Sequence, residues 1–231
     1  MRRLGRWLKW SLLGLIGLVL AWQFWLLGWV LFWKWVDPGT TRFMEIRLVE
    51  LREQNPDARL KMQWVPYARI SPYLKRAIIA AEDASFVDHE GFDWEGIQKA
   101  IEKNQKRGRA VAGGSTISQQ LAKNLFLTPT RSYLRKIEEA IITLMLETLW
   151  SKQRIFEVYL NVIEWGNGVF GAEAAARHYF GIGAAQLGPE QAAKLAGMVP
   201  NPRFYDRNRN APGLAKKAAI IFARMPAAEI P

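Results

Sequence analysis

The segment from Trp10 to Trp33 contains no charged residue, and it constrains the fold more than any other feature of the sequence. As an α-helix its 24 residues would span about 36 Å, enough to cross a hydrocarbon core of about 30 Å. Tryptophans stand at both ends, at positions 7, 10, 33 and 35, and indole rings prefer the membrane interface. The sequence therefore predicts one helix that spans a membrane.

The charges around this segment predict its orientation. Arg2, Arg3, Arg6 and Lys9 precede it, and basic flanks remain in the cytoplasm. Everything after residue 36 would then lie outside the inner membrane. The alternative is a cleaved signal peptide, but its apolar region would be shorter, and no small-residue cleavage site follows this one. We expect an uncleaved anchor.

Composition limits the remaining function classes. The net charge is +11, but the basic residues beyond the anchor are scattered among acidic ones. Residues 36–231 hold 27 basic and 21 acidic residues, a net charge of +6. This modest positive excess suits an anionic lipid surface or a phosphate-bearing substrate and is too weak to indicate nucleic acid.

The absence of cysteine excludes disulfides, thiol nucleophiles and zinc–thiolate sites. With two histidines, we expect no metal held by protein ligands alone.

The pattern along the chain predicts an anchor over 1–35, a connector over 36–70 and one domain over 71–231. In the connector we expect a short helix over 43–53 and a short strand over 58–65. Ser71 and Pro72 are a good N-cap and first helical residue. Strand signals are sparse afterwards, so the predicted domain is mainly α. Its helices are expected at about 73–87, 93–106, 116–126, 132–150, 151–163, 169–179, 186–198 and 212–225.

The first segment that could carry chemistry begins at Glu82 and Asp83. Glu82, Phe86 and His89 share one face if the helix continues through them. A carboxylate on an otherwise apolar helix loses solvation, which raises its pKa and makes it a better base. The alternative is that Glu82 is a salt-bridged acid near a helix end. Asp83 and His89 more readily cap or orient the following loop.

The second segment begins at Gly113 and Gly114, which free the backbone before a helix capped by Ser115 or Thr116. Such a helix N-terminus suits a phosphate group or sugar oxygens. Two polar stripes follow at four-residue spacing: Ser115, Gln119 and Lys123, and beside them Thr116, Gln120 and Asn124.

Two further segments complete the set. Arg131, Arg135 and Glu139 are each four residues apart, so two guanidinium groups and a carboxylate share a helix face. Arginine forks bind phosphate bidentately, although an ordinary charged face has the same spacing. The stretch from Tyr159 to Gly171 contains closely spaced glycines, which predict a tight turn between helices and a mainly scaffold role.

In this order, the four blocks resemble the membrane-anchored peptidoglycan glycosyltransferases, the lysozyme-like group shared with class A penicillin-binding proteins. The blocks are Glu-Asp-x-x-Phe-x-x-His-x-Gly, Gly-Gly-Ser-Thr-Ile-Ser-Gln-Gln-Leu-Ala-Lys-Asn, Arg-Lys-x-x-Glu and Tyr-Leu-Asn…Gly-x-Gly-x-Phe-Gly…Tyr-Phe-Gly. The resemblance covers about residues 66–225. No Ser-x-x-Lys or Lys-Thr-Gly motif appears, so the sequence is similar to the monofunctional members.

The resemblance implies a role for each matching residue. Glu82 would be the general base and Glu139 the second acidic residue of the cleft. Lys123, Arg131 and Arg135 would hold a donor pyrophosphate. The other implied substrate-binding residues are Ser115, Thr116, Gln119, Gln120, Asn124, Asp83, Phe86 and His89. The last block departs at Lys194, where the family is usually apolar, so no role is assigned there.

The implied reaction is polymerisation of lipid II into β-1,4 glycan strands by inverting transfer, with release of polyprenyl pyrophosphate. Its implied setting is a bacterial inner membrane, with the catalytic domain in the periplasm. Implied partners are lipid II, the growing glycan chain, and divisome or elongation proteins. No cofactor is required, although Mg²⁺ or Mn²⁺ could assist at the pyrophosphate. The alternatives are a lytic transglycosylase or lysozyme-like enzyme, and a cell-wall scaffold with a degenerate site.

Overall fold

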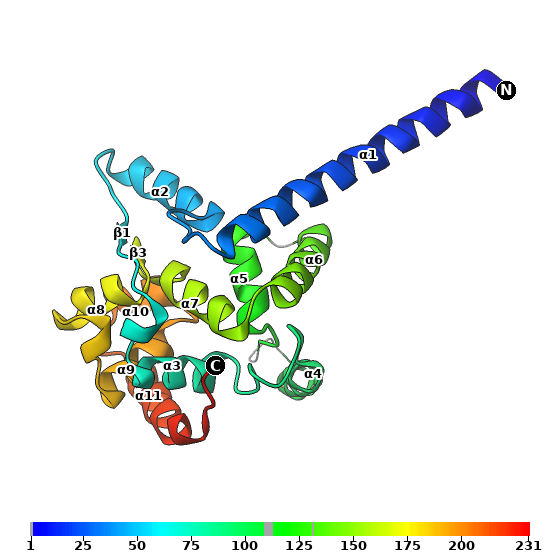
Figure 1. Ribbon diagram of the computed structural model, residues 1–231. Coiled ribbons are helices and arrows are strands. Elements are labelled where there is room, and N and C mark those ends of the chain that lie inside the picture. Colours follow the sequence, from blue (N-terminus) through cyan, green and yellow to red (C-terminus); the bar gives the residue numbers. More distant parts are fainter. Residues whose placement is uncertain (1, 109–112, 131) are drawn as a thin grey trace. The chain divides into compact units, whose positions relative to one another are not determined.

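The computed structural model describes residues 2–108, 113–130 and 132–231 (Figure 1). The described chain divides into two compact units, one ending at Val36 and the other comprising Asp37–Pro231. The predicted mainly helical domain is confirmed. Its helices are α2 (Arg42–Gln54), α3 (Pro72–Glu82), α4 (Trp94–Arg107), α5 (Ile117–Phe126), α6 (Tyr133–Leu149), α7 (Lys152–Val162), α8 (Ala172–Phe180), α9 (Pro189–Met198), α10 (Pro202–Arg207) and α11 (Pro212–Arg224).

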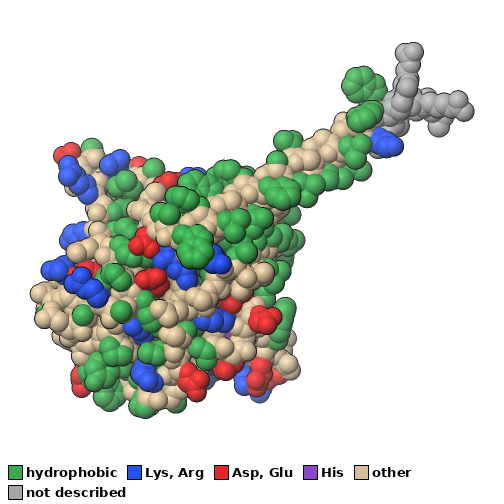
Figure 2. Space-filling view, in the orientation of Figure 1, with side chains coloured by type: hydrophobic (Ala, Val, Ile, Leu, Met, Phe, Trp, Pro, Cys, Tyr) green, Lys and Arg blue, Asp and Glu red, His purple; other side chains and the backbone are tan. Residues whose placement is uncertain are grey.

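The first unit is a single long helix, α1 (Arg2–Trp33). Its segment Lys9–Trp33 is long and apolar enough to cross a membrane. Hydrophobic side chains predominate along it in Figure 2. Trp22 and Trp25 stack with their ring centroids 4.8 Å apart. One such helix is consistent with a single-pass membrane anchor.

In the second unit, α9 packs directly against α11, and α3 packs against α9 and, less extensively, against α11 (Figure 1). Gly197 of α9 permits a close approach of α11, since a Cβ there would lie 3.1 Å from Leu214 Cδ1. A second group contains α5, which contacts both α6 and α7. Phe86, Phe156 and Tyr159 are fully buried in the domain core. Burial of such a side chain contributes about 1.5–3 kcal/mol.

Local capping explains where these helices begin. Ser71 accepts a hydrogen bond from the Tyr73 amide, and Pro72 occupies the first turn of α3, as predicted. The cap of α5 is Thr116, whose side chain accepts from the Gln119 amide while the Gln119 side chain accepts from the Thr116 amide. This reciprocal capping box satisfies two amides that the helix leaves free. It fixes the start of α5 at Ile117, three residues after Gly114.

The prediction that α3 continues to residue 87 was wrong. The helix ends at Glu82, and Asp83 adopts a non-helical backbone with φ −161°. The Asp83 carboxylate accepts from the Ile117 amide at 2.9 Å and lies 3.0 Å from His89 Nε2. These contacts hold Asp83 outside the helix, because a side chain that bonds distant groups competes with helix continuation.

A small three-stranded sheet was largely missed by the sequence analysis. β1 (Lys61–Met62) is parallel to β3 (Val169–Phe170), which pairs antiparallel with β2 (Glu164–Gly166). The glycine-rich block therefore forms a short hairpin rather than only a turn between helices. Gly171 follows it with φ +81°, and a Cβ there would lie 2.7 Å from Asn161 O. The predicted helix from residue 169 begins instead at Ala172. Helix α10 was also not predicted.

The segment before α3 is tied to the domain by buried polar contacts. Asn161, fully buried on α7, accepts from the Val65 amide and donates to the Val65 carbonyl, both at 3.0 Å. On α2, Arg47 donates to Glu164 of β2 at 3.1 Å, and both side chains are buried. Residues from Asp37 onward therefore belong to the same compact unit as the helices.

We predict that Asn161→Ala lowers the free energy of unfolding by about 2–5 kcal/mol, because it leaves two buried backbone groups of Val65 without partners. Thermal or chemical unfolding of the full chain in detergent measures the change. Asn208→Ala is the matched control, since Asn208 is exposed, directly follows α10, and its side chain donates to the nearby Phe204 O. Equal stabilities of the two variants would contradict the prediction.

Candidate functional site

Three cavities that share lining residues form a cleft along α5. The cation cavity, of about 320 Å³, is lined by Phe43, Ser115, Gln119, Gln120, Lys123, Pro129, Arg135, Lys136 and Glu139. The Glu82 cavity, of about 360 Å³, lies along Ala80–Ala84 and Gly113–Thr116 and shares Ser115 with the first. The α10 cavity, of about 260 Å³, shares Phe43, Gln120 and Lys123 with the cation cavity and continues to Pro200–Arg203.

Glu82 lies in this cleft at the C-terminal end of α3. Ala80 and Ala81 line the same cavity beside it, and their small side chains leave the carboxylate accessible. Burial raises the pKa of Glu82 above its ordinary value. The hydrogen bond from Gln120 and the charges of Lys123 and Lys217 oppose this rise, but they do not cancel it. The predicted desolvated carboxylate is present.

The Glu82 carboxylate is oriented by two other side chains. Gln120 Nε2 donates to Glu82 Oε2 at 2.9 Å. Tyr159, which is fully buried, donates from its hydroxyl to Gln120 Oε1 at 3.0 Å. Burial raises the pKa of Tyr159 well above its usual range, so the phenol keeps its proton. The amide of Gln120 therefore turns its donor toward Glu82 and its acceptor toward Tyr159.

The cation cavity is organised around Glu139. This carboxylate is only 3% exposed, and Arg135 donates to it at 2.7 Å. Lys136 pairs with its other oxygen. Burial lowers the pKa of Lys123, against the opposing attraction of Glu139, while Arg135 and Lys136 lower it further. Three cations thus gather around one acid, which leaves a net positive site.

The two polar stripes of α5 divide between these cavities. Ser115, Gln119 and Gln120 line the cation cavity, and Asn124 lines the α10 cavity. Thr116 is buried at the Glu82 cavity, and its hydroxyl donates to Gly91 O at 2.7 Å. Because Thr116 and Gln119 form the capping box of α5, their side chains serve the fold as well as the cleft.

Residues of the first block do not share one helix face, because α3 ends at Glu82. Asp83 lines the Glu82 cavity but is committed to Ile117 and His89. Phe86 is fully buried against Phe156, with ring centroids 5.5 Å apart. Phe86 and His89 line none of the three cavities, and their contacts support the loop behind Glu82. Arg131 lies outside the described residues.

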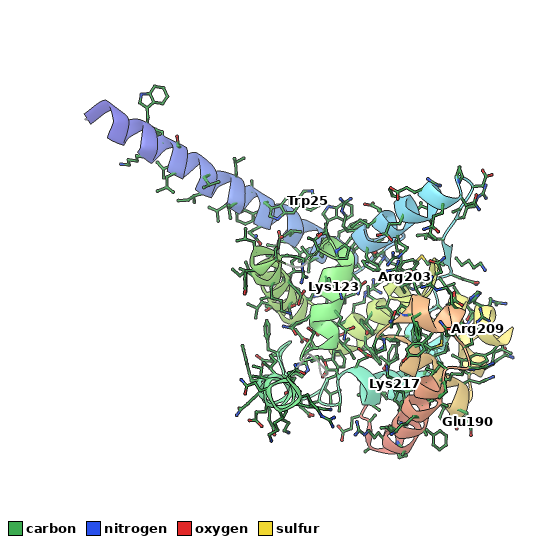
Figure 3. The ribbon with its side chains drawn as sticks, turned by 180° about the vertical axis from the view of Figure 1, so that it is seen from behind. Trp25, Lys123, Glu190, Arg203, Arg209 and Lys217 are labelled. Carbon is green, nitrogen blue, oxygen red and sulfur yellow. The ribbon has the colours of Figure 1, made fainter. Side chains whose placement is uncertain are left out.

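Sequence reasoning missed several residues that line the cleft. Arg47 and Arg203 line the α10 cavity, and Arg224 of α11 lines the Glu82 cavity. Figure 3 labels Lys123 on α5, Arg203 on α10 and Lys217 on α11. Lys217 and Arg224 are seven residues apart, so they lie on one face of α11. That spacing could have predicted that the two side chains share a helix face. It does not show which other part of the protein this face contacts.

The donor set at the cation cavity does not fit a metal held by the protein. Among the described residues, no group of three His, Asp or Glu side chains could hold an ion. The carboxylate at this cavity, Glu139, already pairs with Arg135 and Lys136.

Comparison with known proteins identifies the family. The family model described as Transglycosylase matches residues 49–226. Over 231 residues and all of both chains, the sequence is 80% identical to the biosynthetic peptidoglycan transglycosylase of Dechloromonas aromatica. Identity to the protein of the same name is 61% over all of both chains in Azoarcus sp.. It is 64% over 93% of each chain in Methylobacillus flagellatus.

These matches confirm the resemblance seen in the four sequence blocks and the mainly α, lysozyme-like fold class. They extend over most of the sequence and, for the relatives in Dechloromonas aromatica and Azoarcus sp., over both chains completely. The chain therefore belongs to the transglycosylase family.

Proposed function

We propose that this peptidoglycan glycosyltransferase polymerises lipid II into β-1,4 glycan by inverting transfer with release of polyprenyl pyrophosphate. One observation carries the proposal: the cleft combines a desolvated carboxylate, Glu82, with a cluster of cations, Lys123, Arg135 and Lys136. Helix α5 contributes to both sites. A transfer reaction that needs a base for the acceptor and cations for an anionic leaving group requires this combination.

Glu82 would act on the acceptor. A sugar hydroxyl has a high pKa, so its attack is aided by a base that removes the proton as the new bond forms. A carboxylate whose pKa is raised by burial is a better base than one in water. Gln120 and Tyr159 hold this carboxylate in one orientation, which reduces the reorganisation needed during attack.

Lys123, Arg135 and Lys136 would stabilise the leaving group. As the acceptor oxygen bonds to the donor C1, the bond from C1 to the pyrophosphate oxygen breaks and its electron pair leaves with the pyrophosphate. The proton goes to Glu82. Cations in a partly desolvated cavity stabilise this developing charge, so a strong general acid is not needed. An α-linked donor then gives a β-linked product in one displacement.

We assign Glu139 a positioning role, because its carboxylate pairs with Arg135 and Lys136 and so holds both cations at the cavity.

The same observations bear on the alternatives. A hydrolase or lytic enzyme that cleaves glycan releases no pyrophosphate, so it has no use for three cations gathered around a buried acid. A scaffold with a degenerate site would not need the Tyr159–Gln120–Glu82 arrangement.

The membrane-spanning α1 supports a lipid-linked substrate, because the catalytic unit would stay near the bilayer that holds the polyprenyl chain. We place the catalytic unit on the periplasmic side of the inner membrane.

We predict that Glu82→Gln lowers polymerisation of labelled lipid II by about 10²–10⁴-fold, the usual contribution of a general base. The substitution nearly preserves shape and removes the proton acceptor. Glu190→Gln is the control, since Glu190 is an exposed acid at the start of α9 (Figure 3). Full activity of Glu82→Gln would assign the base elsewhere.

The rate should depend on pH in a bell shape. Glu82 works as a carboxylate, so activity rises with pH through its pKa, which lies above the usual Glu value of 4.5. Lys123 works as a cation, so activity falls as pH passes its pKa, which lies below the usual 10.5. Steady-state rates across pH measure both limbs. An acid limb at or below the ordinary Glu pKa contradicts the assignment of Glu82.

We predict that Tyr159→Phe moves the acid limb to higher pH. Without the hydroxyl, the Gln120 amide loses its fixed orientation, and the hydrogen bond that lowers the pKa of Glu82 weakens. Tyr179→Phe is the matched control, because Tyr179 donates to Trp165 O at 2.9 Å and contacts neither Gln120 nor Glu82. If both variants keep the wild-type pH profile, Tyr159 is only structural.

A further inference from the structure

A fourth cavity, the α11 cavity, opens beside Glu82 and has not been assigned a role. It measures about 190 Å³ and shares Ala80, Ala81, Glu82 and Arg224 with the Glu82 cavity. It shares no lining residue with the cation cavity. Whatever binds in it therefore contacts the reaction centre without occupying the proposed pyrophosphate site.

Two cations of α11 line this cavity. Lys217 and Arg224 are both exposed and lie on the same helix face. Within the described part of the chain, no ion pair to a carboxylate is formed by either of them. Lys217 Nζ lies 5.1 Å from the centroid of the Tyr205 ring, a cation–π contact that orients its side chain. Figure 3 shows Lys217 on α11.

Apart from these two cations and Glu82, the lining of the α11 cavity is apolar. Ala80, Ala81, Ala196, Gly197, Pro200, Ile220 and Ile221 form it, and Ile220 is 44% exposed. Small and aliphatic side chains accommodate methyl groups, while the two cations attract an anion. The cavity thus fits a ligand segment that carries both methyl groups and a carboxylate.

The charge of Lys217 also bears on Glu82, because it lowers the pKa of Glu82 and so opposes the effect of burial. An anion that pairs with Lys217 would offset this charge and raise the basicity of Glu82 in the complex. Binding of an anion in the α11 cavity would therefore act on the neighbouring base.

We propose that Lys217 and Arg224 form a subsite for a carboxylate of the peptide that the glycan substrate carries. The proposal rests on the proposed function, whose substrate, lipid II, is a disaccharide-peptide on a polyprenyl pyrophosphate, and it names the part of that substrate bound next to Glu82. The peptide supplies both features that the α11 cavity fits, methyl groups and carboxylates. The other source of an anion, the pyrophosphate of a second lipid-linked substrate, is distinguished by the experiment.

The experiment compares two lipid-linked substrates that differ only in the peptide, one with free carboxylates and one with all of them amidated. The variants are Lys217→Met, Arg224→Met and the double variant of the full chain in detergent. Lys216→Met is the control, since Lys216 is an exposed neighbour that lines neither the α11 nor the Glu82 cavity. Rates are measured at a pH at which Glu82 is ionised in every variant.

For the free-carboxylate substrate, we expect KM to rise about five-fold for each cation removed, as for an exposed ion pair. KM for the amidated substrate should be unchanged in all variants, and Lys216→Met should match the wild type. An unchanged KM with the free-carboxylate substrate overturns the proposal. An equal rise with both substrates also overturns it and assigns the subsite to a pyrophosphate.

Failure of the proposed function would appear differently, as a wild type that polymerises neither substrate although it is folded. In that case, direct binding of the two substrates to the wild type and the double variant still tests the subsite. Tighter binding of the free-carboxylate substrate by the wild type alone supports it, and equal binding by both proteins contradicts it.

Discussion

The removal of the Glu82 carboxylate from water is the constraint on which the rest of the site depends. Burial alone would favour the protonated acid, which is no base. The cleft offsets this with one hydrogen bond from Gln120 and with the charge of Lys123, and the pKa remains raised. The raised pKa makes the Glu82 carboxylate a better base, while Gln120 and Lys123 favour its ionised form. Tyr159 secures this balance, because it determines which end of the Gln120 amide faces Glu82.

Helix α5 connects this base to the cations. Its N-terminus is fixed by the capping box of Thr116 and Gln119 and by the Asp83 carboxylate, which accepts from the Ile117 amide. The same helix then presents Gln120 to Glu82 and Lys123 to the cavity of Glu139. A shift of α5 would alter both ends of the cleft together. The buried contacts of Asp83 therefore bear on the position of α5.

Local patterns in the sequence predicted the helices and the desolvated acid, because an apolar run before Glu82 and a cap before α5 act over a few residues. They could not predict the end of α3, since the partners of Asp83 include Ile117, 34 positions away. Nor could they pair Tyr159 with Gln120, which are 39 positions apart. The strands β1 and β3 have two residues each, too short for an alternating pattern to be recognised. Lys217 and Arg224 line a cavity together with Glu82 only because α11 packs beside α3.

The most direct test of this account is the pKa of Glu82 itself, measured by carbon NMR on protein with labelled glutamate carboxyl groups. The signal is assigned by its loss in Glu82→Gln. The account predicts a titration above the usual glutamate range in the wild type, and a further rise when Gln120 is replaced by Ala, because the hydrogen bond that lowers the pKa is removed. A Glu82 that titrates at or below the ordinary value would contradict the claim that burial makes it the base.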